Sequence, residues 1–171
     1  MRRRRSRLPL WLALILTAVG GAAALAAPAA PAFRAKLLDS GRVVDSRDLL
    51  GKKVVIVRFQ ASWCKPCVRE SAALAHLAER YRDRGVELIA FQVQDAAADV
   101  RRFVRAQKVN YPVVLDPKLA VGNRFGARGT PYTVVVDKKG EIVARLAGPS
   151  AVTKLPRILD AALGGSPSRK L

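Results

Sequence analysis

Histidine and cysteine are scarce in this chain of 171 residues, which holds one histidine, His76, and two cysteines, Cys64 and Cys67. A structural zinc site needs four ligands, and these three residues cannot supply them. His76 also lies off the apolar stripe of its predicted helix, so we expect it at the surface without a catalytic partner. We therefore predict that the protein holds no metal.

Acidic residues are also few. The chain carries 13 of them against 31 lysines and arginines, which gives a formal net charge of +18. Five arginines lie in the first seven residues, and the other 26 basic residues are scattered over the rest. Such a basic surface favours acidic partner proteins or an anionic membrane surface. Because the basic residues form no periodic stripe and no nucleic-acid-binding motif accompanies them, we predict no nucleic-acid partner.

Charged side chains are absent from residues 8–33, directly after the arginine-rich start. This pattern is typical of an export signal, and cleavage sites of small residues end at Ala26 and at Ala32. An uncleaved anchor is the alternative, because the apolar run is long enough to span a bilayer. We predict a signal peptide or membrane anchor over 1–32 and an exported domain over 33–171. The protein is then periplasmic or extracytoplasmic, either secreted or anchored to the cytoplasmic membrane by its N-terminus.

The exported part is long enough for one folded domain and too short for two. No long heptad pattern or exposed apolar stripe requires a dimer, so we expect a monomer. Turn residues and hydrophobic periodicity predict the following elements. They are a small hairpin (36–38 and 42–44), a strand (54–59), a helix (66–84), a strand (86–93), a helix (95–109), a short strand (111–115), a short helix (119–125), a hairpin (132–136 and 142–146) and a closing helix (151–163). This order predicts an α/β fold with a central mixed sheet and helices on both faces.

The two cysteines form a Cys-x-x-Cys motif where the strand 54–59 gives way to the helix 66–84. A disulfide this short closes a tiny loop and adds little to stability, so a redox pair is the favoured interpretation. The amide groups and dipole of the helix N-terminus, together with Lys65, are expected to lower the pKa of Cys64 below its usual value of about 8.5. Cys64 is then the nucleophile. Cys67, one turn further, is expected to be less exposed and to resolve the mixed disulfide.

Trp63 directly precedes the first cysteine, and Pro66 fits the first helical turn, where a missing N–H costs little. Trp63 can shield the sulfurs and offer substrates a flat contact. The alternative is an aromatic side chain that only packs.

The run Val54 to Glu70 (VVIVRFQASWCKPCVRE), together with Gly129-Thr130-Pro131 and the strand after it, resembles the TlpA/ResA-like family of exported thioredoxins. The likeness extends from about Ser46 to Gly148. It implies a thioredoxin fold and a protein thiol–disulfide oxidoreductase that uses its own disulfide and no other cofactor. It also implies exported protein substrates, for example in cytochrome c maturation, and a membrane thiol carrier as electron donor.

The resemblance also assigns roles to three further residues. Pro131 corresponds to the family's cis-proline beside the dithiol, and Thr130 to the residue whose backbone binds an extended substrate segment. Glu70 corresponds to the family's buried acid, which tunes the thiol pKa values or moves a proton. A solvated helix carboxylate is the alternative for Glu70, since Ser71-Ala72 stands where the family usually has proline.

Arg58 departs from the pattern, because thioredoxin-like chains usually have Asp or Asn six residues before the first cysteine. A buried arginine needs a partner, and Glu70 is the nearest candidate in the motif. We expect Arg58 and Lys65 to favour the Cys64 thiolate. Gln60, where an aromatic residue is frequent, is expected to reshape the substrate groove.

Four functions remain open at this point. A disulfide reductase is the leading one, and a disulfide-forming oxidant is the second, because a stabilised thiolate favours the reduced enzyme. A peroxiredoxin-like thiol peroxidase is less favoured, because its Thr-x-x-Cys motif is replaced here by Ala61-Ser62-Trp63 before Cys64. A non-catalytic thioredoxin-like binding module is the fourth.

Overall fold

The computed structural model describes residues 27–149 and 151–164. Its elements, in chain order, are β1 (Arg34–Lys36), β2 (Val43–Asp45), the 3-10 helix η1 (Ser46–Leu49), β3 (Val54–Gln60), α1 (Lys65–Arg82), β4 (Val86–Val93), α2 (Ala97–Ala106), β5 (Val113–Asp116), α3 (Ala120–Phe125), β6 (Tyr132–Val136), β7 (Ile142–Ala147) and α4 (Ala151–Ala162). Five strands form one mixed sheet in the order β5-β4-β3-β6-β7. The strands β3, β4 and β5 are parallel, and β6 and β7 are antiparallel to their neighbours.

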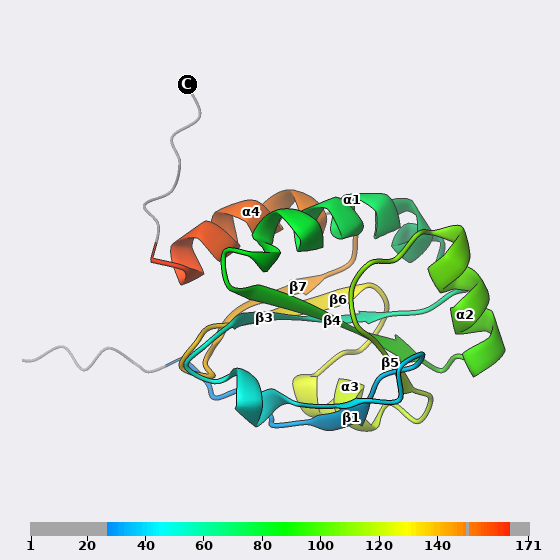
Figure 1. Ribbon diagram of the computed structural model, residues 1–171, viewed down its shortest axis with the longest axis horizontal. Coiled ribbons are helices and arrows are strands. Elements are labelled where there is room, and N and C mark those ends of the chain that lie inside the picture. The colour runs from blue at the N-terminus through cyan, green and yellow to red at the C-terminus, as the bar shows by residue number, and fades with distance from the viewer. Residues whose placement is uncertain (1–26, 150, 165–171) are drawn as a thin grey trace, which may run out of the picture.

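The strand β3 is the centre of this sheet, and all seven of its residues are buried. Its near-continuous run of branched aliphatic residues suits a strand that is covered on both faces. On one face, α1 and α4 pack through side chains such as Leu74, Tyr81 and Leu155. On the other face, Phe33 and Phe125 pack against the sheet. Figure 1 shows the two layers, with α1 and α4 above the sheet and α3 and β1 below it.

The predicted α/β architecture and the order of the predicted strands and helices are confirmed, but several bounds differ. The small hairpin is formed by 34–36 and 43–45 instead of 36–38 and 42–44, the strand predicted over 111–115 is Val113–Asp116, and the 3-10 helix η1 was not predicted. The helix predicted over 95–109 is α2, Ala97–Ala106, which begins without a side-chain hydrogen bond at its N-cap, Ala96. The helix predicted over 66–84 ends at Arg82, and Gly85, with φ +88°, follows in a turn. The closing helix α4 continues through Pro156.

The predicted targeting segment lies mostly outside the described residues, but its last part does not. Residues 28–32 contact the domain: the amide of Ile142 donates to the carbonyl of Pro28, and the amide of Ala30 donates to the carbonyl of Gly140, both at 2.8 Å. The guanidinium of Arg124 donates to the carbonyl of Ala32 at 2.5 Å. The boundary after residue 32 therefore stays a prediction, while the folded contacts begin at residue 28.

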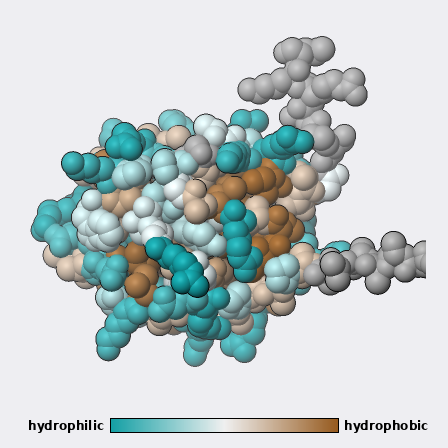
Figure 2. Space-filling model, turned by 180° about the vertical axis from the view of Figure 1, so that it is seen from behind, coloured by the Kyte–Doolittle hydropathy of each residue, from teal (hydrophilic) through white to brown (hydrophobic). Residues whose placement is uncertain are grey.

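Figure 2 shows that the rear face of the domain carries hydrophilic side chains around its edges, with residues of intermediate hydropathy and separate hydrophobic patches between them. Among the described residues, the large hydrophobic side chains that are exposed are Val43, Leu50, Trp63 and Val143. Within the same residues, no helix combines the length and the apolar character needed to cross a membrane.

Candidate active site

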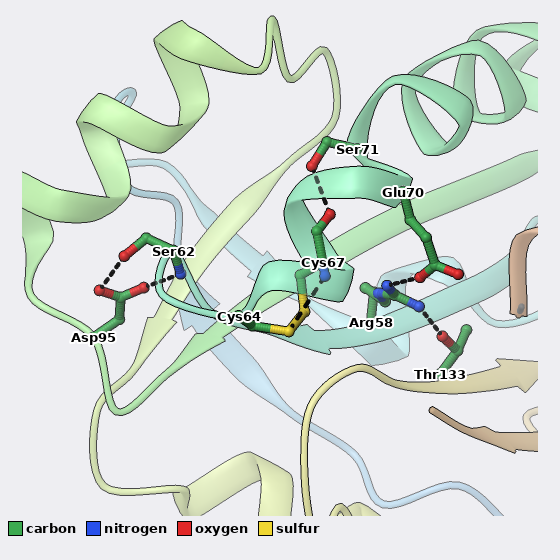
Figure 3. Close-up of a disulfide and its surroundings, with 8 residues drawn as sticks. All are labelled: Arg58, Ser62, Cys64, Cys67, Glu70, Ser71, Asp95 and Thr133. Atoms are coloured by element: carbon green, nitrogen blue, oxygen red, sulfur yellow. Dashed lines mark hydrogen bonds and ion pairs between the residues drawn. A yellow bond between two sulfur atoms is a disulfide. The ribbon is translucent and has the colours of Figure 1, made fainter. Parts of the chain in front are cut away.

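The two cysteines form a disulfide at the N-terminus of α1, with an S–S distance of 2.16 Å (Figure 3). Cys64 is the N-cap residue of the helix, and its Sγ accepts a hydrogen bond from the amide of Cys67 at 3.3 Å. The same amide can stabilise negative charge on Sγ when the disulfide is reduced. Cys64 is 4% exposed and Cys67 is fully buried, so the predicted order of exposure is confirmed.

The loop before Cys64 is fastened to the end of the neighbouring strand β4. Asp95 accepts hydrogen bonds from the amide of Ser62 at 2.6 Å and from its hydroxyl at 2.9 Å (Figure 3). The indole Nε1 of Trp63 donates to the carbonyl of Gln94 at 3.3 Å. Sequence reasoning missed Asp95. The available indication was that β3 and β4 are parallel, so that residues just after each strand meet at one edge of the sheet.

Arg58 and Glu70 form an ion pair under the start of α1. The Nη2 of Arg58 lies 2.6 Å from Oε2 of Glu70, and its Nη1 donates to Oγ1 of Thr133 on β6 at 2.9 Å (Figure 3). The Arg58 side chain is fully buried and that of Glu70 is 13% exposed. The predicted pairing is thus present, and Thr133 is a partner that the sequence motif did not indicate.

Further polar side chains are buried on the same face of the sheet as Arg58. Gln60 and Gln92 are register partners on β3 and β4, and both are fully buried. Tyr111 lies close to them, and burial raises the pKa of Tyr111 above its usual value, opposed in part by Gln60 and by the charge of Arg58. The buried polar side chains of Gln60, Gln92 and Tyr111 thus extend from the ion pair towards the edge of the sheet. Because Gln60 is fully buried, its side chain points into the protein and not into a substrate groove.

The loop before β6 borders the dithiol region. The Thr130–Pro131 peptide bond is cis, as the resemblance implied, and the carbonyl of Pro131 accepts from the amide of Gly148 at 2.9 Å. Trp63 and Thr130 line one groove of about 330 Å³. Trp63 is 58% exposed, so it does not serve mainly to pack the core.

The remaining residues singled out from the sequence lie at the surface. Lys65 is exposed at the first position of α1, and His76 is exposed further along the same helix, as expected. In the part of the chain that the structure describes, no three His, Cys, Asp or Glu side chains form a cluster that could hold a metal ion.

The protein has a disulfide at a helix N-terminus, a cis-proline in the loop before β6 and a five-stranded mixed sheet. Together these features define a thiol–disulfide oxidoreductase with a thioredoxin fold. In this class the redox-active disulfide carries the electrons and no further cofactor is needed. The chain belongs to the Redoxin family, whose model matches residues 25–163.

Curated relatives and solved structures agree with this assignment. The chain is 29% identical over 120 residues to the thiol-disulfide oxidoreductase ResA of Bacillus cereus, which covers 70% of this chain and 69% of the relative. It is 35% identical over 103 residues to ResA of Halalkalibacterium halodurans, covering 60% and 58%. A solved thiol:disulfide interchange protein from Chlorobium tepidum superposes with a TM-score of 0.73 at 27% identity, covering 81% of this chain and 97% of that one.

Proposed function

We propose that this protein is an extracytoplasmic disulfide reductase that acts on exported proteins, with cytochrome c maturation as the expected setting. The observation that carries the proposal is the disulfide between Cys64 at the helix N-terminus and the buried Cys67. The arginine-rich start and the apolar run after it support export. A membrane thiol carrier is the proposed electron donor, and the apolar run is either removed or retained as an anchor.

The proposed reaction is two successive thiol–disulfide exchanges. The Cys64 thiolate attacks one sulfur of a substrate disulfide, which forms a mixed disulfide and releases the other substrate sulfur as a thiolate. The Cys67 thiolate then attacks Sγ of Cys64 and releases the second substrate sulfur. Two electrons pass to the substrate, its two thiolates take up the two protons that the enzyme thiols lost, and the enzyme is left with the Cys64–Cys67 disulfide. The membrane carrier returns it to the dithiol.

The neighbouring residues take supporting roles in this proposal. Trp63 and Thr130 line the groove beside the dithiol, and Pro131 shapes the loop against which an extended substrate segment lies. Proline has no N–H, so no donor from Pro131 competes for the sulfurs. Glu70 and Arg58 act as a pair next to the helix start.

The ion pair also supports the reductive direction. A lone buried cation close to the cysteines would stabilise the thiolate strongly and make the enzyme an oxidant. Here the charge of Arg58 is matched by Glu70 at 2.6 Å, so the pair is neutral overall. Lys65 is exposed, and solvent screens its effect on Cys64.

The reduction potential of the Cys64–Cys67 pair tests the proposal, measured by equilibration against glutathione and dithiothreitol buffers in the domain that begins at Ala27. We expect a reducing potential, closer to that of thioredoxin at about −270 mV than to that of DsbA at about −120 mV. A value near the oxidising end would assign disulfide formation instead.

A further inference from the structure

The groove beside the dithiol combines apolar side chains with the exposed polar residues Gln94 and Asn123 and one cation, Arg128. Its floor is formed by Phe59, Val93, Leu119 and Ala127, and the exposed indole of Trp63 forms one wall. The segment from Arg128 to Thr130 lines the same groove. At about 330 Å³ the groove is at the lower end of the size range of ligand pockets, which suits one amino-acid side chain better than a whole cofactor.

Arg128 lines two grooves. The second one, of about 340 Å³, is also lined by Pro131 and Gly148. The Arg128 side chain is exposed and has no ion-pair partner among the described residues. A substrate segment that lies along the loop at Thr130 would therefore pass the Arg128 guanidinium whichever of the two grooves its side chains entered. Guanidinium groups bind carboxylates through two parallel hydrogen bonds.

The exposed charges around the dithiol are positive. Lys65 and Arg69 are exposed on the first turns of α1. The nearby acids are already engaged: Asp95 is 9% exposed and bonded to Ser62, and Glu70 is paired with Arg58. Within the residues that the structure describes, no acidic side chain lines the groove.

We propose that this groove selects substrates that carry a glutamate or aspartate within two positions of the reacting cysteine, and that Arg128 recognises the carboxylate. The inference rests on the proposed exchange with protein substrates and specifies which of them react fastest. The methylene groups of such a side chain would lie against the apolar floor, while its carboxylate reaches Arg128. Because side chains alternate in an extended segment, one close to the cysteine faces the groove when the segment lies along Thr130.

Three synthetic peptides with one intramolecular disulfide, identical except for Glu, Gln or Lys beside the cysteines, test the proposal. Each is mixed with the reduced protein, and the fluorescence change of oxidation gives the second-order rate constant. We expect the order Glu, Gln, Lys, with a Glu-to-Gln ratio of about two- to fivefold, the range for an exposed ion pair. The ratio should fall as salt is added.

Two variants assign the effect. In Arg128→Gln the Glu-to-Gln ratio should approach one, and in Arg128→Glu the Lys peptide should become the fastest. The matched control is Lys52→Gln, which removes one positive charge next to the start of β3, at the opposite end of that strand from the disulfide, and should keep the ratio. A ratio that persists in Arg128→Gln, or that is lost equally in Lys52→Gln, overturns the role of Arg128.

The outcomes also separate this inference from the proposed function. Exchange with all three peptides at equal rates would overturn the acidic preference and leave the oxidoreductase proposal standing. Absence of exchange with every peptide, in a protein that dithiothreitol reduces normally, would contradict both.

Discussion

Arg58 and Glu70 form a buried pair whose two halves depend on each other. Arg58→Met removes the cation that pairs with the largely buried Glu70 carboxylate, which is expected to lower the free energy of unfolding by about 3–5 kcal/mol. The double variant Arg58→Met/Glu70→Leu removes both charges and is expected to lie much closer to the wild type. Urea unfolding of the two single variants and the double variant measures the coupling. Additive effects in this cycle would show that the pair contributes nothing as a unit.

The same pair should influence the chemistry of the first cysteine. Arg58→Asn removes the cation and leaves a carboxylate near the helix start, so we expect the pKa of Cys64 to rise. Thiolate absorbance of the reduced protein near 240 nm, followed against pH, measures it. Lys65→Gln is the companion variant, and its smaller effect should diminish further in high salt because Lys65 is exposed. An unchanged titration in Arg58→Asn would remove Arg58 from the list of residues that act on the thiol.

Asp45 makes the stability of the domain depend on acid pH. Hydrogen bonds from the side chain and backbone of Arg47 lower the pKa of Asp45 from 3.8 to about 2. Its stabilising effect is therefore fully present above pH 3.8 and is lost as the pH falls through 2. We expect Asp45→Asn to be less stable than the wild type at pH 6, with a difference that shrinks as the pH falls from 4 to 2 and vanishes below it. Urea unfolding at pH 6, 4 and 2 checks this, and a difference that does not change with pH would contradict it.

At the scale of elements, the loop that carries Cys64 is held by the end of β4 through Asp95. Asp95→Ala removes two hydrogen bonds to a charged acceptor, so the amide of Ser62 should exchange with solvent about tenfold faster or more. Hydrogen exchange followed by NMR measures this. Asp116→Ala is the matched control, since Asp116 accepts from the amides of Val121 and Gly122 elsewhere in the fold. It should speed exchange there and leave Ser62 unchanged, whereas an unchanged Ser62 in Asp95→Ala would show that Asp95 does not hold the loop.

The segment 28–32 is a second element whose effect can be measured. Its two backbone hydrogen bonds, to Ile142 and Gly140, are each worth about 1 kcal/mol. A chain that begins at Phe33 is therefore expected to be about 2 kcal/mol less stable than one that begins at Ala27. Chemical unfolding of the two purified chains gives the difference. Equal unfolding midpoints would mean that the segment adds nothing to stability. A lower midpoint for the shorter chain would favour cleavage after Ala26.

The sequence sufficed for the features that depend on local pattern. The strand β3 and the helix α1 follow from hydrophobic periodicity. The contact between Arg58 and Glu70 follows from a motif in which one residue lies near the end of a strand and the other in the second turn of the next helix. The contact of Thr133 with Arg58 could not be predicted, because it depends on the register between strands far apart in the chain. The contact of Asp95 with Ser62 was only indicated by the parallel pairing of β3 and β4, which brings the two loops together without specifying which side chains bond. The contacts of the segment 28–32 could not be predicted either, since its small apolar residues carry no pattern that distinguishes a paired edge from a cleavage region.

At the scale of the whole molecule, redox state and stability are linked. A folded protein that holds its disulfide at a more reducing potential than the unfolded chain must be more stable when oxidised, and 30 mV corresponds to about 1.4 kcal/mol. For the proposed reductase we expect the oxidised form to resist guanidinium better than the form reduced with dithiothreitol. The Cys64→Ser variant, which cannot form the disulfide, should be insensitive to dithiothreitol. Greater stability of the reduced form would point to an oxidant.

The chain enters the domain at the opposite end of β3 from the disulfide. Ala30 contacts Gly140 in the turn beside the start of that strand, and Cys64 follows its end. Seven residues of extended strand cover about 23 Å. Anything fastened to the N-terminal side, whether a bilayer, a resin or a fused protein, therefore sits at the far pole of the molecule. The disulfide lies at the other end of the strand from the tether, and a large partner can approach that end without passing the point of attachment.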